Sequence, residues 1–247
     1  MRKSKYYQRF LVAVCFCLTA YGVMAQKTLS IKPSFGWVFP LSTIEQPSSS
    51  LQLSQSILFS PQLGGALELD PGKRWRFSVG GYYSGYGMSY KESRFAQSDR
   101  GDMLRVPLGA HYSFADNIRV LNLDRTRYAY LLLFRLYAIA GLDFNYATTQ
   151  VSSWVSNGKL AGRDSVITVQ QEAGKGSRNL AAGIGFGIQF FDRADHARLD
   201  ISFYCSRGLG LLAYQNILYH TRNEHIRLLS RGSLVGVNLS YPIRFNL

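Results

Sequence analysis

Apolar residues alternate with polar or small residues through most of this sequence, and the alternation recurs in about eight segments. Successive side chains of a β-strand point to opposite faces, so each segment predicts a strand with one apolar and one polar face. The alternating segments are residues 29–39, 62–69, 74–88, 104–114, 132–146, 179–190, 198–205 and 235–247.

Glycine occupies the face opposite the apolar one in the segment near residue 180. Gly183, Gly185 and Gly187 alternate there with Ile184 and Phe186. Glycine at so many positions would break a helix and would leave one side of a sandwich core empty. In a narrow barrel, the same glycines leave space in the lumen for long side chains from other strands. The sequence therefore predicts an all-β fold, an antiparallel up-and-down barrel of about eight strands.

The first 25 residues predict a cleaved signal peptide, followed by one barrel domain over residues 26–247. Four basic residues and no acidic one precede an apolar stretch over residues 10–20. Val23-Met24-Ala25 then supplies the small residues expected before cleavage at Gln26. The apolar stretch is shorter than the ~20 residues that a membrane-spanning helix needs. Cleavage would leave Cys205 as the one remaining cysteine, which excludes an internal disulfide.

The charge of the mature chain is basic but scattered. After cleavage, 24 of the 28 Lys and Arg remain against 15 Asp and Glu, a net charge of +9. Because the mature chain has no run of like charges, the sequence argues against nucleic acid as a partner. No apolar stretch after residue 25 reaches the length of a transmembrane helix, so insertion into a membrane would require a barrel.

The lengths of the connections favour a transmembrane barrel. Outer-membrane barrels join their strands by short periplasmic turns and longer outer loops. The predicted outer loops, all long, are residues 40–61, 89–101, 148–178 and 209–231. The predicted periplasmic connections are residues 70–73, 115–128 and 192–196, of which the first and last are tight turns.

In such a barrel the apolar faces contact lipid and the polar faces fill the lumen. Mixed arginine and aspartate among glycines suits a confined lumen, where the planar guanidinium can bridge carboxylates. Trp37, Trp75, Tyr146 and Tyr241 stand near strand ends, where membrane interfaces favour aromatic residues. A barrel of about eight strands is filled by its own side chains, which argues against an open pore. The residues predicted to form a structural charge network in the lumen are Lys32, Glu68, Arg74, Arg76, Arg105, Arg135, Asp143, Arg198, Asp200 and Arg244.

Two segments resemble the PorT-like family of outer-membrane β-barrels. One is Met103-Leu104-Arg105-Val106-Pro107-Leu108, similar to the family's strand motif of alternating apolar residues followed by Pro-Leu. The other is the ending Ser240-Tyr241-Pro242-Ile243-Arg244-Phe245-Asn246-Leu247. The chain departs from the family at Arg105, where an acidic residue is common, and in its long third outer loop. The resemblance implies an outer-membrane location and a link to protein secretion or envelope assembly.

Histidines are the candidates for chemistry. His111 and Ser113 lie two residues apart on one strand face, as a base and a nucleophile would. Their position near the periplasmic end, facing the lumen, favours a hydrogen-bonded structural histidine. His220, Glu224 and His225 could meet on a helical turn of the fourth outer loop, but a zinc site needs further ligands. The sequence therefore predicts no catalytic residue, metal or cofactor.

The two longest outer loops differ in character. The third is polar and predicts either a two-stranded extension or a partly disordered segment. The fourth, residues 209–231, is too apolar for a free loop and predicts a cap over the barrel mouth or a surface for a partner. Basic residues expected on the outer side, where they could pair with lipid phosphates, are Lys159, Arg163, Lys175, Arg222, Arg227 and Arg231.

The sequence thus predicts a small non-enzymatic barrel of a Gram-negative cell outer membrane, structural or partner-binding. Its expected partners are outer-membrane lipid, lipopolysaccharide and other envelope or secretion proteins. An outer-membrane lipid A-modifying enzyme and a secreted soluble ligand-binding barrel are the alternatives.

Overall fold

The computed structural model describes residues 28–45, 53–54, 58–71, 74–92, 95–120, 132–149, 156–160, 163–172, 176–192, 196–219 and 224–246. The predicted signal peptide lies outside the described residues. The strands are β1 (Thr28–Glu45), β2 (Leu53–Ser54), β3 (Ser60–Asp70), β4 (Trp75–Glu92), β5 (Phe95–Val120), β6 (Leu132–Ala147), β7 (Ser156–Leu160), β8 (Arg163–Glu172), β9 (Arg178–Phe191), β10 (Ala197–Gly208), β11 (Ala213–Tyr219), β12 (Glu224–Ser240) and β13 (Ile243–Asn246). Among these residues, no helix is long and apolar enough to cross a membrane.

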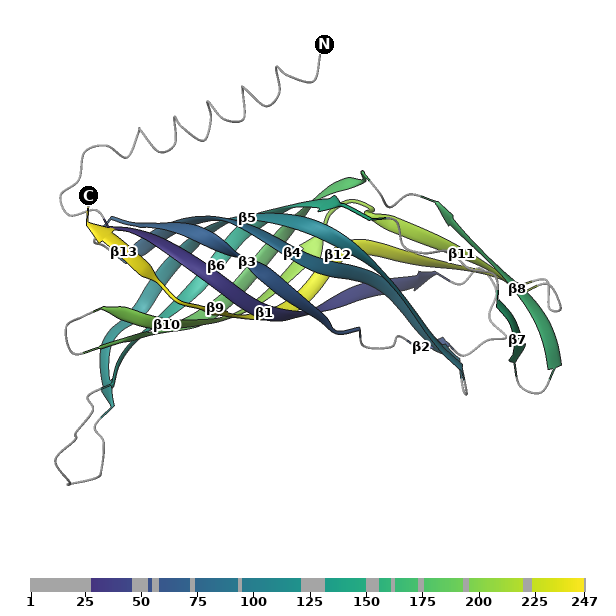
Figure 1. The fold of residues 1–247 in the computed structure, drawn as a ribbon, viewed down its shortest axis with the longest axis horizontal. Coiled ribbons are helices and arrows are strands. Elements are labelled where there is room, and N and C mark those ends of the chain that lie inside the picture. The colour runs from purple at the N-terminus through teal and green to yellow at the C-terminus, as the bar shows by residue number, and fades with distance from the viewer. Residues whose placement is uncertain are drawn as a thin grey trace, which may run out of the picture.

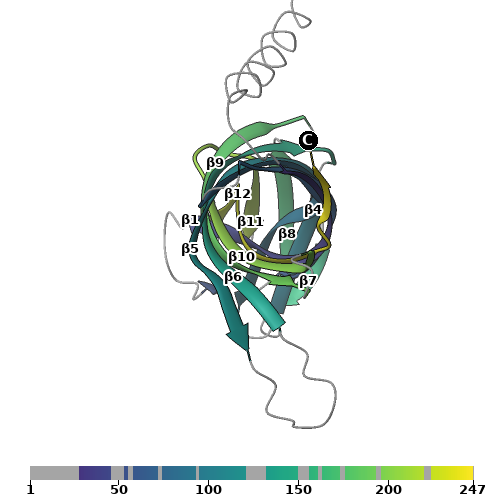
Figure 2. The ribbon, with the colours of Figure 1, turned by 90° about the vertical axis from the view of Figure 1, so that its left-hand side faces the viewer.

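The strands close into a barrel of antiparallel neighbours (Figure 2). Its wall runs β1-β3-β4-β5-β6-β9-β10-β12, and β12 pairs with β1 to complete the ring. β13 continues β12 past Tyr241 and Pro242 and pairs with the start of β1. The ladder is interrupted there because proline has no N–H to donate. The predicted up-and-down barrel of about eight strands is confirmed, with β12 and β13 together as its last strand.

The two ends of the barrel differ (Figure 1). The terminal end is where β1 begins and β13 ends, with Thr28 paired to Asn246. There the β3–β4 and β9–β10 connections are short, as predicted. Of the predicted connection over residues 115–128, residues 115–120 belong to β5, which continues to Val120 through two irregularities, and residues 121–128 lie outside the described residues. At the opposite end, called the loop end here, β2, β7, β8 and β11 extend beyond the ring.

Much of the sequence predicted as outer loops forms paired strands at the loop end. β4 and β5 pair up to Glu92 and Phe95, so the prediction of a loop over residues 89–101 was wrong. In the third loop, β7 and β8 form the hairpin that was one of the two expectations. In the fourth, β11 pairs with β12 on one side and with β8 on the other. The prediction over residues 89–101 failed because this polar segment satisfies its backbone groups by pairing as a hairpin beyond the ring.

The barrel has its apolar side chains outside and its charged side chains inside. Leu63, Ile184 and Phe186 are 59%, 71% and 55% exposed on the outer face. Lys32 and Arg76 are 5% and 0% exposed and lie within the lumen wall. A soluble ligand-binding barrel would turn its apolar side chains inward, so this orientation argues against that alternative.

Candidate functional site

Four charged side chains meet in the lumen toward the terminal end. Nζ of Lys32 lies 2.7 Å from Oε2 of Glu68 and 2.6 Å from Oδ2 of Asp200. Nη1 of Arg76 donates to Oε1 of Glu68 at 2.9 Å. These residues come from β1, β3, β4 and β10, so the ion pairs connect strands around the ring. With two cations and two carboxylates, the charges of this cluster balance.

Neutral groups complete the cluster, which is called the charged layer below. The Tyr137 hydroxyl donates to Oδ1 of Asp200, and the Arg76 guanidinium lies 4.5 Å from the Tyr137 ring centroid. Gln189 accepts from Arg76 at 3.2 Å and donates to Asp200 at 3.5 Å. Gly187 on β9 makes room for Tyr137, because a Cβ at that position would collide with the ring. The glycine-rich face of residues 179–190 therefore admits a long side chain from β6, as the sequence predicted.

A second polar group lies next along the lumen toward the loop end. The Arg105 guanidinium packs between two tyrosine rings, 5.3 Å from Tyr82 and 4.4 Å from Tyr204, and its Nε lies 3.8 Å from Asp143. The Tyr204 hydroxyl donates to Gln62 at 2.9 Å. This arrangement neutralises Arg105 by one carboxylate and two aromatic faces.

A cavity of about 100 Å³ lies against the charged layer and the Arg105 group. Its lining includes Arg105, His111 and Ser206. Nε and Nη1 of Arg105 and Oγ of Ser206 are buried without a hydrogen-bond partner among the described residues. Buried polar atoms beside a cavity of this size are expected to bind water. No group of three metal-ligating side chains occurs in the part of the chain that the structure describes.

Arg135 and Arg244 lie nearer the terminal end, where other contacts hold them. Arg135 bonds to Asp116 at 2.5 Å and to Asp70 at 3.5 Å, and its side chain is 21% exposed. The Arg244 guanidinium lies 5.1 Å from the ring centroid of Phe191. Both residues are half-buried at the mouth of the barrel.

Arg74 and Arg198 lie outside the lumen, contrary to the prediction. Arg74 precedes β4 and donates to the Tyr112 hydroxyl at 3.3 Å on the outer face. Arg198 sits at an irregularity of the β9–β10 register, between Ala197 and Leu199, which removes it from the inward series. Its guanidinium is held by Asp192 at 2.7 Å and the Tyr241 hydroxyl at 3.2 Å. Alternation fails at both positions because each lies at the start of a strand.

His111 contacts a serine that the sequence did not suggest. Its Nε2 lies 2.9 Å from Oγ of Ser78 on β4, and its Nδ1 lies 3.5 Å from Oε2 of Glu68. Ser113 is 2% exposed, and its Oγ has no partner among the described residues. The oxygens of Glu68 are already bonded to Lys32 and Arg76, which favours a structural role for this histidine.

Of the group His220, Glu224 and His225 considered for a helical turn, the two described residues lie in a strand. Glu224 and His225 begin β12, opposite Tyr219 and Leu218 of β11. His220 lies outside the described residues.

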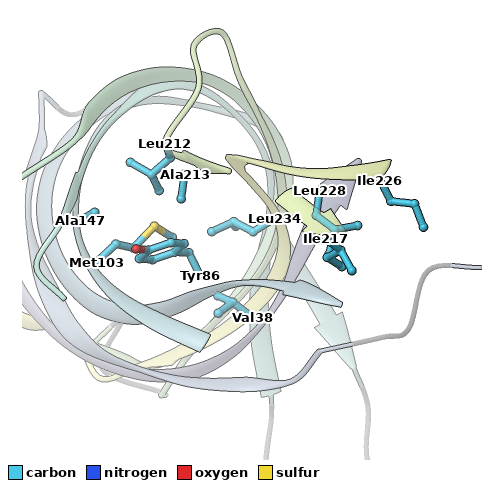
Figure 3. Packing of buried hydrophobic residues seen from close by; sticks show 10 residues of the cluster. All are labelled: Val38, Tyr86, Met103, Ala147, Leu212, Ala213, Ile217, Ile226, Leu228 and Leu234. Atoms are coloured by element: carbon cyan, nitrogen blue, oxygen red, sulfur yellow. The ribbon is translucent and has the colours of Figure 1, made fainter. Parts of the chain in front are cut away.

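The lumen at the loop end is apolar, which the sequence did not predict. Figure 3 shows Tyr86, Met103, Leu212 and Leu234 converging inside the ring. The residues of this buried cluster within the ring, called the apolar plug below, are Val38, Tyr86, Met103, Ala147, Leu212, Ala213 and Leu234. Three further residues continue the cluster beside the ring, on the β11–β12 extension: Ile217, Ile226 and Leu228. The available signal was the loss of alternation, as in the unbroken apolar run Trp37-Val38-Phe39. Of the two expectations for the fourth loop, a cap over the mouth or a surface for a partner, the burial of Leu212 and Ala213 supports the cap.

Comparisons with known proteins support the fold. No protein-family model matches the sequence, and no curated protein matches it either. The structure is similar to that of the outer membrane protein OprG from Pseudomonas aeruginosa, with a TM-score of 0.54 and 13% sequence identity. The match covers 92% of this chain and 99% of that chain. At this identity the likeness shows the fold, that of an outer-membrane β-barrel, and the resemblance to the PorT-like family stays a prediction.

Proposed function

We propose that this chain is a small, non-enzymatic outer-membrane protein of a Gram-negative bacterium, with a structural or partner-binding role. The observation that carries this proposal is the orientation of its side chains. Large apolar residues cover the outside of the barrel, while lysine, arginine and carboxylates are buried within it. In water this outer face would be an aggregation surface, whereas in a bilayer it is matched to lipid.

The lumen is closed by two layers in series. The charged layer fills the section toward the terminal end, and the apolar plug fills the section at the loop end. Transport of ions through the lumen would require both layers to separate. A closed lumen supports a role in which the barrel anchors the chain and its extended strands act outside the membrane.

The strands beyond the ring offer the surface for such a role. β8 and β7 extend the sheet away from the barrel through β11, and β7 pairs with β8 alone among the described strands. A strand edge with free N–H and C=O groups can accept a strand from another protein. A partner in secretion or envelope assembly, which the PorT-like resemblance implies, is the finer form of this proposal.

Heat-dependent gel mobility of protein extracted from outer membranes tests the proposal. We expect a different mobility for unboiled and boiled samples, recovery in the outer-membrane fraction, and no conductance in planar bilayers. Recovery as a soluble periplasmic protein would overturn the membrane assignment. Steady conductance by the folded barrel would overturn the closed lumen.

An enzyme that modifies lipid A is the second candidate, because Ser78, His111 and Glu68 stand in the order nucleophile, base and carboxylate. This candidate predicts that Ser78→Ala and His111→Ala alter lipid A composition in cells while the barrel stays folded. We expect unchanged lipid A for both variants, measured by mass spectrometry of extracted lipid. A change that follows both substitutions would favour the enzyme.

A further inference from the structure

We propose that the loop-end rim of the barrel carries a binding site for the phosphate group of an amphipathic lipid. The site consists of three arginines, Arg178, Arg207 and Arg231, with the leucines Leu209 and Leu211 between them. This inference rests on the proposed function, because it requires the outer face of the barrel to lie in a membrane.

Backbone and asparagine hydrogen bonds hold the three arginines in one part of the rim. Arg178 opens β9, Arg207 stands next to last in β10, and Arg231 belongs to β12. The N–H of Leu209 donates to the carbonyl of Leu180 at 2.7 Å, which ties the end of β10 to the start of β9. Nδ2 of Asn179 donates to the carbonyl oxygens of Gly210 at 3.0 Å and Arg231 at 2.5 Å. These hydrogen bonds fix the backbone of the rim, from which the three arginine side chains project.

The positive charge of this site is not neutralised by the described part of the chain. All three arginines are exposed, and none forms an ion pair with a described carboxylate. Arg178 stacks on Tyr146, 5.6 Å from its ring centroid, which leaves its N–H groups free to bind an anion. By contrast, Arg74 and Arg198 at the terminal end already donate to tyrosine hydroxyls, and Arg198 pairs with Asp192.

The apolar residues of the site indicate an amphipathic ligand. Leu209 and Leu211 are 61% and 38% exposed, although the next residue, Leu212, is fully buried. Below them on β9, toward the terminal end, Ile184 is 71% exposed and belongs to the apolar outer face. Free phosphate would leave these side chains uncovered. A phosphorylated lipid would place its phosphate at the arginines and its acyl chains along the leucines and the apolar wall.

The test compares two double variants that remove the same charge. Arg207→Gln with Arg231→Gln changes the proposed site, and Arg74→Gln with Arg198→Gln changes the opposite end. Each folded barrel is titrated in detergent with lipid A carrying its phosphates, and separately with the same lipid after removal of the phosphates. Inorganic phosphate serves as the third probe, and native mass spectrometry measures the bound fraction. Heat-dependent mobility first shows that each variant is folded.

We expect lipid A to bind the loop-end variant about 10- to 30-fold more weakly than the unchanged protein, with less difference at high salt. The terminal-end variant should bind as the unchanged protein does, and dephosphorylated lipid should bind all three proteins weakly. Equal binding by both variants, or equal binding of dephosphorylated lipid, would overturn the site. Tight binding of inorganic phosphate would overturn the assignment to a lipid. Failure of the unchanged protein to fold as a barrel would instead contradict the proposed function.

Discussion

The two ends of the lumen solve the same packing problem with opposite chemistry. Toward the terminal end, Lys32, Glu68, Arg76 and Asp200 cross the lumen and pair with one another. At the loop end, Met103, Tyr86 and Leu234 face inward, and Leu212 enters from the β10–β11 connection. One section is filled by long charged side chains of the wall, and the other by apolar side chains with help from a loop.

This difference teaches which kind of change each section should tolerate. In the charged layer, removal of one partner leaves a buried charge uncompensated. The resulting loss in the free energy of unfolding depends on which other charged groups remain near it. In the apolar plug, the cost of a truncation follows the volume of the cavity that it leaves. The comparison can be tested by one substitution in each layer, with an exposed neighbour as control.

The largest effect is expected for Lys32→Met, because Lys32 is the cation shared by both carboxylates of the charged layer. We expect the free energy of unfolding to fall by about 3–5 kcal/mol. The free energy of unfolding is measured by urea unfolding of the protein in lipid vesicles, with gel mobility as the readout of the folded fraction. Arg198→Gln, at an exposed ion pair, should leave the free energy of unfolding nearly unchanged.

A double variant sharpens this first prediction. Lys32→Met with Asp200→Asn removes one cation and one carboxylate together, so it should recover part of the lost stability. A Lys32→Met protein as stable as the unchanged one would show that the ion pairs do not hold the lumen.

A smaller loss is expected for Leu212→Ala in the apolar plug. Leu212 is fully buried, so its truncation should lower the free energy of unfolding by about 2–4 kcal/mol. Leu211→Ala, at the exposed neighbour, should change it by less than about 1 kcal/mol. The same urea series measures both. If the charged layer closes the lumen by itself, the Leu212→Ala protein should show no ion conductance in planar bilayers. New conductance would show that the apolar plug is the main barrier to ions.

The smallest effect is expected for Gly187→Ala, which tests the packing of the charged layer against the β9 wall. An added Cβ would collide with the Tyr137 ring, and we expect a loss of about 1–3 kcal/mol. Gly183→Ala is the matched control, because on the same face its nearest contact would be an ordinary 3.4 Å to Cβ of Ser206. Equal stability of the two variants, measured by thermal unfolding in detergent, would contradict the fit of Tyr137 over Gly187.

Part of the site was predictable because inward residues in the regular part of a strand follow a fixed period. Lys32, Glu68, Arg76 and Asp200 all obey it, and the structure brings them together. Arg74 and Arg198 do not, because Arg74 precedes β4 and Arg198 lies at an irregularity of the β9–β10 register. Ser78 as the contact of His111 could not be found either, because a cross-strand neighbour depends on register.

The sequence by itself determined the strands, the barrel and the two faces of its wall, because alternation and glycine spacing are local properties of the backbone. Only the tertiary structure decided what fills the lumen at each level and how the loop-end strands pair. Those outcomes depend on the strand register and on contacts between residues far apart in the chain, such as Lys32 with Asp200 and Leu212 with Met103. A local pattern specifies the face of the strand on which a side chain lies. The residue that this side chain contacts across the lumen is fixed only when the ring of strands closes.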